Sequence, residues 1–336
     1  MSFPASGLLK LLRPRQWSKN LVCMAGAFFS GHIFEAKYAI AACLSTAAFC
    51  AAASFVYVIN DILDRDRDRN HPRKKDRPIA SGQVTVPQAL VLAFLLLCIA
   101  IAIGSQAGAA INPRIGLRVL AILGAYAGIN ICYSAGLKNL SLVDATVVAA
   151  GFILRIYAGT TAVEIPPSSW LLLCTFFLAL FLAFAKRRAE LNAASGHLTA
   201  SRPVLQKFTV SEGIVTGTRS VLQEFDTPNT DINATRAVLH KYNVSMLDRF
   251  CNICATLTIA TYALFSVLGH PNHALIITTP PVVMGIFRYL LLIERYHEGE
   301  APDAILVKDW PIQLAILIWA VLYIAVFYGH LKIDVQ

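Results

Sequence analysis

The sequence predicts an all-α polytopic membrane protein with about nine transmembrane helices. Composition is the first reason: of 336 residues, 56% are hydrophobic and only 15% are charged, whereas an average soluble domain is about 25% charged. A soluble protein this apolar could not cover its surface with polar groups, and a disordered chain would be more polar. We therefore expect one integral membrane domain over residues 1–336.

The second reason is a series of apolar stretches of about 20 residues, the length that crosses a bilayer as a helix. The N-terminus has basic residues before its first apolar stretch, but no small-residue cleavage site follows. We therefore expect a retained first helix and not a removed signal peptide. The expected spans are residues 20–35, 38–59, 87–106, 117–134, 141–161, 169–186, 251–268, 273–292 and 311–330.

The third reason is the distribution of charge, because long basic connections alternate with short, nearly neutral ones. Lys and Arg accumulate in cytoplasmic loops, so we expect the N-terminus and the long connections on the cytoplasmic side. This explains the net charge of +9 without a nucleic-acid partner. The longest connection, 187–250, holds either an interfacial helix near residues 234–250 or a partly disordered lid.

A regularly spaced group of acids follows the second span. Asp61, Asp64 and Asp68 stand at i, i+3 and i+7, which places them on one face of a helix, and Asn60 lies four residues before Asp64. Like charges on one face repel one another unless a cation binds them, and Mg²⁺ prefers carboxylate oxygens with substrate phosphates. We therefore expect these four residues to form a magnesium site.

The residues after the acids favour a diphosphate as the substrate at this site. Residues 73–77 form a basic run that includes Lys75 and Arg77, and basic side chains are suited to phosphates. The alternative is a solvated, charge-rich loop in which neighbouring arginines neutralise the acids. The position at the end of an apolar span favours a site, because ionisable residues at this depth face the bundle interior.

The pattern Asn60-Asp61-x-x-Asp64-x-x-x-Asp68 resembles the first Asp-rich motif of the UbiA-type prenyltransferase superfamily. The resemblance implies nine helices around a central cavity that opens to the membrane. Typical members carry a second motif, DxxxD, after the sixth span. This sequence has Lys186-Arg-Arg-Ala-Glu190 there, which argues against an isoprenyl diphosphate as the substrate that ionises.

Four further segments resemble one branch, the decaprenyl-phosphate phosphoribosyltransferases. The branch implies Mg²⁺, phosphoribosyl diphosphate (PRPP) as donor, a polyprenyl phosphate from the lipid bilayer as acceptor, and a bacterial inner membrane with the site facing the cytoplasm. The segments are Arg13-Pro-Arg-Gln-Trp-Ser-Lys19-Asn20, His71-Pro72 with Arg77-Pro-Ile-Ala-Ser-Gly82, Tyr133-Ser-Ala-Gly-Leu-Lys138, and Lys186-Arg187 with Glu190.

We expect Asp61, Asp64, Tyr133 and Lys138 to be the catalytic residues. Basic residues near the cytoplasmic face either bind substrate or only anchor helices, and anchoring is favoured for Arg13. The predicted substrate-binding residues are Lys19, Asn60, Lys75, Arg77, Asp144, Arg155, Lys186 and Arg187.

Asp144 and Arg155 are included because ionisable residues within a span are functional candidates. They share a face of the fifth span, but eleven residues separate them by more than about 15 Å, so they cannot pair directly.

Two other functions remain open. The first is a prenyltransferase that acts on an aromatic or quinone precursor, and the missing second motif argues against it. The second is a transporter or channel, whose sites tend toward the midplane of the membrane, whereas these acids gather at one face. In the resembling branch the product is the precursor of a lipid-linked arabinose donor, used for cell-wall arabinan or nodulation factors. A homo-oligomer is compatible with the sequence.

Overall fold

The structure is a computed structural model that describes residues 5–70, 74–200, 241–268, 273–296, 305 and 308–328. Throughout these ranges the regular secondary structure is helical. Eight of the described helices are long and apolar enough to cross a membrane, and the chain is a multi-pass membrane protein. They are α3 (Ala36–Leu63), α5 (Val86–Gln106), α6 (Ile115–Ala135), α7 (Val143–Ala162), α8 (Ser169–Ala200), α9 (Val244–Leu268), α10 (Thr279–Tyr296) and α12 (Trp310–Phe327).

The expected first span, 20–35, is not one continuous helix. The N-terminal segment consists of α1 (Ala5–Leu12), a 3₁₀-helix η1 (Pro14–Met24) and a short α2 (Ala25–Phe29). Its backbone packs directly on α7, because a Cβ on Gly159 would lie 1.6 Å from the carbonyl oxygen of Cys23. The segment is thus held inside the bundle, where the polar Asn20 is fully buried. Because it is packed on other helices, it does not have to form a continuous lipid-facing α-helix.

The sixth helix is longer than the sequence predicts, which shortens the 187–250 connection. Helix α8 continues to Ala200, and α9 already begins at Val244. Arg188 ties the start of the extension to its neighbours, because its side chain donates to Asp248 of α9 and to the carbonyl oxygen of Ile293 in α10. Residues 244–250 of the expected interfacial helix form the start of α9, and residues 234–240 lie outside the described residues.

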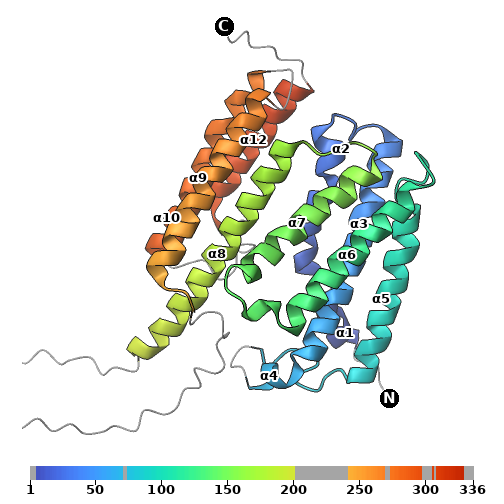
Figure 1. The fold of residues 1–336 in the computed structure, drawn as a ribbon, viewed down its shortest axis with the longest axis vertical. Coiled ribbons are helices and arrows are strands. Elements are labelled where there is room, and N and C mark those ends of the chain that lie inside the picture. Colours follow the sequence, from blue (N-terminus) through green and yellow to red (C-terminus); the bar gives the residue numbers. More distant parts are fainter. Residues whose placement is uncertain are drawn as a thin grey trace, which may run out of the picture.

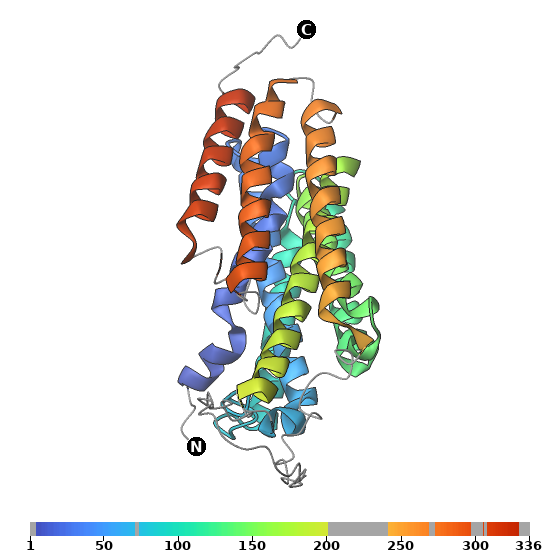
Figure 2. The same cartoon turned by 90° about the vertical axis from the view of Figure 1, so that its left-hand side faces the viewer.

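The helices form a bundle with two distinct ends (Figure 1). Helix α1 and the short α4 (Arg65–Arg69) lie at one end, and the C-terminal end of α12 lies at the other, as Figure 2 also shows. Helices α3, α5 and α6 lie on one side of α7, whereas α9, α10 and α12 lie on the other side, beyond α8. This arrangement brings α4, the end of α6 and the start of α7 to the same end of the bundle.

Candidate functional site

The three acids lie at the end of the bundle that carries α4, but not on one continuous helix. Helix α3 ends at Leu63 and α4 begins at Arg65, so Asp64 occupies the junction between them. Asp61, on the last turn of α3, and Asp68, on α4, are both 3% exposed. The break turns Asp64 toward the end of α6, whereas Asp61 and Asp68 converge on one cation.

That cation is Arg77, from the connection between α4 and α5. Its Nη1 lies 3.0 Å from Asp61 Oδ1 and 2.7 Å from Asp68 Oδ2. Lys138, in the short 3₁₀-helix η2 (Leu137–Asn139), places Nζ 2.6 Å from Asp64 Oδ1. The structure therefore brings two of the predicted site residues, Arg77 and Lys138, together with these acids.

Arg13 is the residue of this site that sequence reasoning assigned to an anchoring role. Its Nη2 lies 2.6 Å from Asp61 Oδ1, and its guanidinium carbon lies 5.0 Å from the centre of the Tyr57 ring. Its membership of the same family-like segment as Lys19 is the one sequence signal that could have indicated this role. We call the group of Asp61, Asp64 and Asp68 with Arg13, Arg77 and Lys138 the acid cluster.

A second group of polar and charged side chains joins α7 to α8 and to Tyr242, which lies just before α9. Asp144, in the first turn of α7, is fully buried, and its Oδ2 lies 2.6 Å from Arg187 Nε. Arg187 also reaches Glu190 Oε2 at 2.8 Å, and the Tyr242 hydroxyl donates to Asp144 Oδ1 at 3.1 Å. We call Asp144, Arg187, Glu190 and Tyr242 the Arg187 cluster.

Asp144, Arg187 and Tyr242 are closed to solvent, whereas the side chain of Glu190 is 26% exposed. Burial raises the pKa of the Tyr242 phenol, and the neighbouring Asp144 carboxylate acts in the same direction. The phenol therefore stays protonated and able to donate its hydrogen bond. Tyr133, half-buried on α6, lies near Arg187, so this cluster borders on a predicted catalytic residue.

Arg155 lies deeper in the bundle, on α7. Its Nε donates to Asn20 Oδ1 at 2.7 Å, and its Nη1 donates to the carbonyl oxygen of Gly151 at 2.8 Å. Eleven residues of α-helix separate it from Asp144, which corresponds to about 16 Å along the axis. Arg155 therefore ties η1 to α7 from a position well away from the acids. Three rings surround its guanidinium, those of Phe49, Tyr126 and Phe152.

The other predicted site residues have separate positions. Asn60 accepts a hydrogen bond from Ser134 of α6 at 2.7 Å, which places it beside the acid cluster. Lys19 lies on η1 and donates to Gln16 Oε1 at 2.6 Å. Lys75 is exposed on the connection after α4, and Lys186 is exposed on α8. Asn60 thus lies next to the acids through its position on α3, and Lys75 and Lys186 lie on the surface.

The donor atoms at the acid cluster have the chemistry of a magnesium site. Among the described residues, no three His, Cys, Asp or Glu side chains lie close enough together to hold a metal ion. However, carboxylates from α3 and α4 already meet around one positive nitrogen of Arg77. Carboxylate and amide oxygens are the ligands that Mg²⁺ uses in proteins, so the residues present fit this ion.

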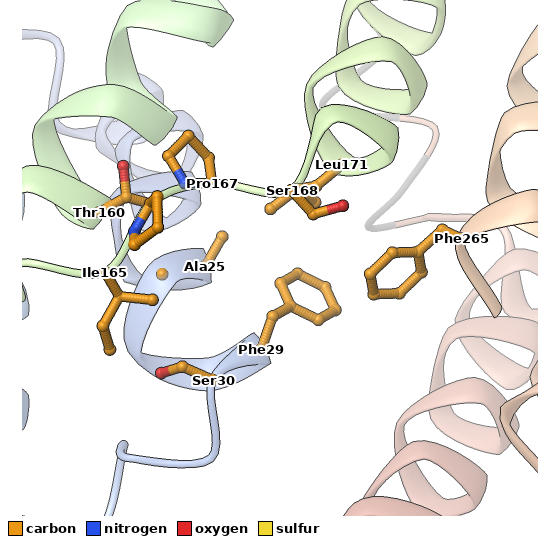
Figure 3. Close-up of a pocket in the computed structure, with 11 residues that line it drawn as sticks. Ala25, Phe29, Ser30, Thr160, Ile165, Pro167, Ser168, Leu171 and Phe265 are labelled. Carbon is orange, nitrogen blue, oxygen red and sulfur yellow. The ribbon is translucent and has the colours of Figure 1, made fainter. Parts of the chain in front are cut away.

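A mostly apolar pocket of about 100 Å³ lies at the opposite end of the bundle, between α2, the connection 163–168 and α9 (Figure 3). Phe29 and Phe265 form one wall, and their ring centres are 5.8 Å apart. None of the lining residues is charged. The pocket is therefore unsuited to a diphosphate, and it includes none of the predicted site residues.

Comparison with known proteins gives a family match and several similar proteins. The UbiA prenyltransferase family matches residues 20–200. A decaprenyl-phosphate phosphoribosyltransferase of Mycolicibacterium smegmatis is 32% identical, over 94% of this chain and 90% of the relative. The nodulation protein NoeC of Azorhizobium caulinodans is 32% identical, over 54% of this chain and 56% of that protein.

Among solved structures, a UbiA homolog from Archaeoglobus fulgidus bound to DMAPP and Mg²⁺ has the same fold. Its TM-score is 0.63 at 19% sequence identity, and the match covers 96% of this chain and 99% of that chain. The expected fold class is thereby confirmed, with the first span in the broken form described above.

Proposed function

Because the chain belongs to the UbiA prenyltransferase family, we propose that it transfers the 5-phosphoribosyl group of PRPP to a polyprenyl phosphate. One observation carries the choice of donor. Where typical members have a second acidic motif after the sixth span, this chain has the buried Arg187, paired with Asp144 and Glu190. The described residues thus offer one acid cluster for a diphosphate, and cations surround it.

The balance of charge suits PRPP. This donor carries a 5-phosphate in addition to its diphosphate, so it is more anionic than an isoprenyl diphosphate and needs more cations. Arg13, Arg77 and Lys138 come from three separate segments and meet the acids. Charge-assisted hydrogen bonds to phosphate are about twice as strong as neutral ones. Lys75 and Lys186, both exposed at this end, are the candidates for the 5-phosphate.

Asn60, Asp61, Asp64 and Asp68 would hold Mg²⁺, which when bound neutralises charge on the departing diphosphate. Arg77 and Lys138 donate to the diphosphate oxygens and hold the donor with C1 of the ribose exposed. Tyr133, on α6, orients the ribose. Preorganised donors of this kind stabilise the charge that develops as the bond between C1 and the diphosphate breaks.

The acceptor supplies its own nucleophile. A phosphate monoester is already ionised near neutral pH, so its oxygen attacks C1 without a strong general base in the protein. Attack on the face opposite the diphosphate forms the new C1–O bond as the old one breaks. We therefore expect inversion at C1, with inorganic diphosphate as the second product.

Asp144, Arg187 and Arg155 support the site without touching the donor. Asp144 and Arg187 are buried and paired with each other, Glu190 and Tyr242 complete their hydrogen bonds, and together they hold the start of α7 against α8. Arg155 fixes η1, which carries Lys19. At about 16 Å along α7 from Asp144, it is too deep for a lipid phosphate that must reach C1.

We also propose where the reaction takes place. The acid cluster faces the cytoplasm of a bacterial inner membrane, and the acceptor enters from the bilayer. The product is the precursor of a lipid-linked arabinose donor. Similarity to a protein named for nodulation supports nodulation-factor arabinosylation as one destination, beside cell-wall arabinan.

The test is a transfer assay with membranes that contain the protein, Mg²⁺, polyprenyl phosphate and radiolabelled PRPP. We expect label to move into the organic phase, and we expect EDTA to prevent it. Membranes with Asp61→Asn serve as the matched control for background transfer. Transfer of an isoprenyl chain to an aromatic acceptor, without transfer from PRPP, would replace this function by the aromatic prenyltransferase alternative.

A further inference from the structure

We propose that Arg13 is a donor-binding residue, which pairs with Asp61 in the donor-free protein and moves to the diphosphate when metal and donor bind together. The proposal rests on the proposed function in one respect, the location of a diphosphate at the acid cluster. It adds that metal and donor bind as a unit, because Arg13 competes with the metal for Asp61.

Arg13 and a metal ligated by Asp61 compete for a single carboxylate. Asp61 is 3% exposed, and a buried carboxylate needs a cation close by. Two guanidinium groups meet its Oδ1, with Arg13 Nη2 at 2.6 Å and Arg77 Nη1 at 3.0 Å. A metal ligated by Asp61 needs a lone pair of this carboxylate, so at least one arginine must move away.

The backbone of Arg13 is held in a conformation that directs its side chain to this oxygen of Asp61. It links α1 to η1 with φ 50° and ψ 57°, a left-handed conformation that residues with a side chain rarely adopt. Neighbours hold this turn on α3: Trp17 donates to Ser54 Oγ, which in turn donates to the carbonyl oxygen of Leu12. A simple helix anchor would need only an exposed position and no strained turn.

The Arg13 side chain is able to leave Asp61. It is 27% exposed, and among the described residues it also contacts the face of Tyr57, one turn before Asp61 on α3. A cation–π contact attracts the guanidinium without using a hydrogen-bond acceptor. A diphosphate at the cluster therefore offers the guanidinium a bidentate partner in exchange for the carboxylate.

The formal charges of the acid cluster cancel. Three carboxylates face three cations, so a divalent metal alone would add charge to a neutral group. Metal together with diphosphate adds little net charge and gives each displaced arginine an anion. The two ligands should therefore bind cooperatively, and the coupling between them should depend on Arg13.

The experiment is a titration of the purified full-length protein with Mn²⁺, followed by electron paramagnetic resonance, with and without inorganic pyrophosphate. Arg13→Gln should tighten the binding of Mn²⁺ alone by about tenfold and weaken pyrophosphate binding in the presence of Mn²⁺ by a similar factor. Arg15→Gln is the matched control, because it removes the same charge from an exposed neighbour. It should change both affinities much less.

The opposite signs of the two effects separate the proposal from a structural role. If Arg13→Gln weakens both affinities, or changes neither more than Arg15→Gln does, Arg13 is an anchor and the proposal is wrong. Should Arg13→Gln fail to fold, Arg13→Lys decides. It keeps the charge but loses the bidentate fork, so pyrophosphate affinity should fall at unchanged Mn²⁺ affinity, and no change in either overturns the proposal.

Pyrophosphate contains neither ribose nor lipid, so this test is independent of the transfer assay. Opposite shifts without any transfer from PRPP would keep Arg13 as a diphosphate ligand and remove the proposed donor. Transfer from PRPP without the opposite shifts would keep the proposed function and remove the role of Arg13.

Discussion

The acid cluster and the Arg187 cluster are both ion-pair networks at the same end of the bundle, but they differ in access to solvent. In the acid cluster the side chains of Arg13 and Arg77 are each 27% exposed, over carboxylates that are buried. In the Arg187 cluster the arginine and Asp144 are both enclosed, at 4% and 0%. One network keeps its cations within reach of a ligand, whereas the other encloses them.

This difference separates two uses of the same ion-pair chemistry. Breaking an enclosed pair leaves a charge with neither partner nor water, so its main effect is on stability. A partly exposed cation can exchange a carboxylate for a phosphate, so changes there should act mainly on binding and turnover. The comparison predicts opposite outcomes for substitutions in the two clusters.

The largest stability effect is expected from Arg187→Met. It leaves Asp144 buried without its cation, and removal of one partner of a buried pair costs about 3–5 kcal/mol. Thermal unfolding in detergent would measure the loss. The matched control is the double variant Arg187→Met with Asp144→Leu, which removes both charges and should recover much of the stability. A single variant as stable as wild type would show that water reaches this cluster.

The reverse pattern is expected for Asp61→Asn. The change keeps the shape of the side chain, and the partly exposed Arg13 and Arg77 can be solvated when the negative charge is lost. Transfer from PRPP should fall by about 10²–10³-fold, as for removal of one preorganised charge-stabilising group. The unfolding temperature should change little. Full activity would exclude Asp61 as a metal ligand, and a large loss of stability would remove the distinction between the clusters.

Much of the fold was predictable because hydropathy and length determine which segments cross a bilayer. The predicted span 87–106 agrees with α5, Val86–Gln106, since local residues define its start: the Thr85 N–H donates to Gln88 Oε1. The prediction of a continuous first span was wrong because hydropathy does not distinguish a segment that faces lipid from one packed inside the bundle. Close backbone packing at Gly159 decides that question, and it depends on a residue far along the chain.

The acids of the site were predictable for a similar reason. Their spacing is local, so a pattern at i, i+3 and i+7 is visible in sequence. The cations that pair with them come from distant segments: 48 residues separate Arg13 from Asp61, and 74 separate Lys138 from Asp64. No local pattern specifies such a pair. Lys138 was identified through a family-like segment, whereas Arg13 was assigned to anchoring and its contact with Asp61 emerged only in three dimensions.

A smaller effect is expected from Lys138→Ala, which removes one cation from the acid cluster. Lys138 Nζ lies 2.6 Å from Asp64 Oδ1 and has 12% of its side chain exposed. Its exposure is therefore between that of Arg13 and Arg77 in the acid cluster and that of the enclosed Arg187. The KM for PRPP should rise about tenfold, the value of one modest ionic contact, with a smaller change in kcat. An unchanged KM together with lower stability would place Lys138 with the enclosed pairs.

The smallest effect is expected at Asp309, which gives the scale of an ordinary peripheral ion pair in the same protein. Asp309 caps α12 by accepting from the Ile312 N–H at 3.1 Å, and Arg288 donates to it at 2.9 Å. Asp309→Ala should lower stability by about 1 kcal/mol, as for other N-caps, at unchanged transfer activity. Asp309→Asn is the matched control, because it keeps an acceptor for the cap and loses only the charge.

The effect at Asp309 should also depend on pH in a defined direction. The hydrogen bond from Arg288 holds the pKa of Asp309 below its ordinary value of 3.8. A carboxyl whose pKa is lowered by folding stabilises the fold above its ordinary pKa and loses that contribution as the pH falls through the lowered value. The difference in stability between wild type and Asp309→Asn should therefore be constant near neutral pH and shrink below about pH 4. A difference at neutral pH as large as that of Arg187→Met would show that exposure does not set the strength of ion pairs in this protein, and the contrast between the two clusters would lose its basis.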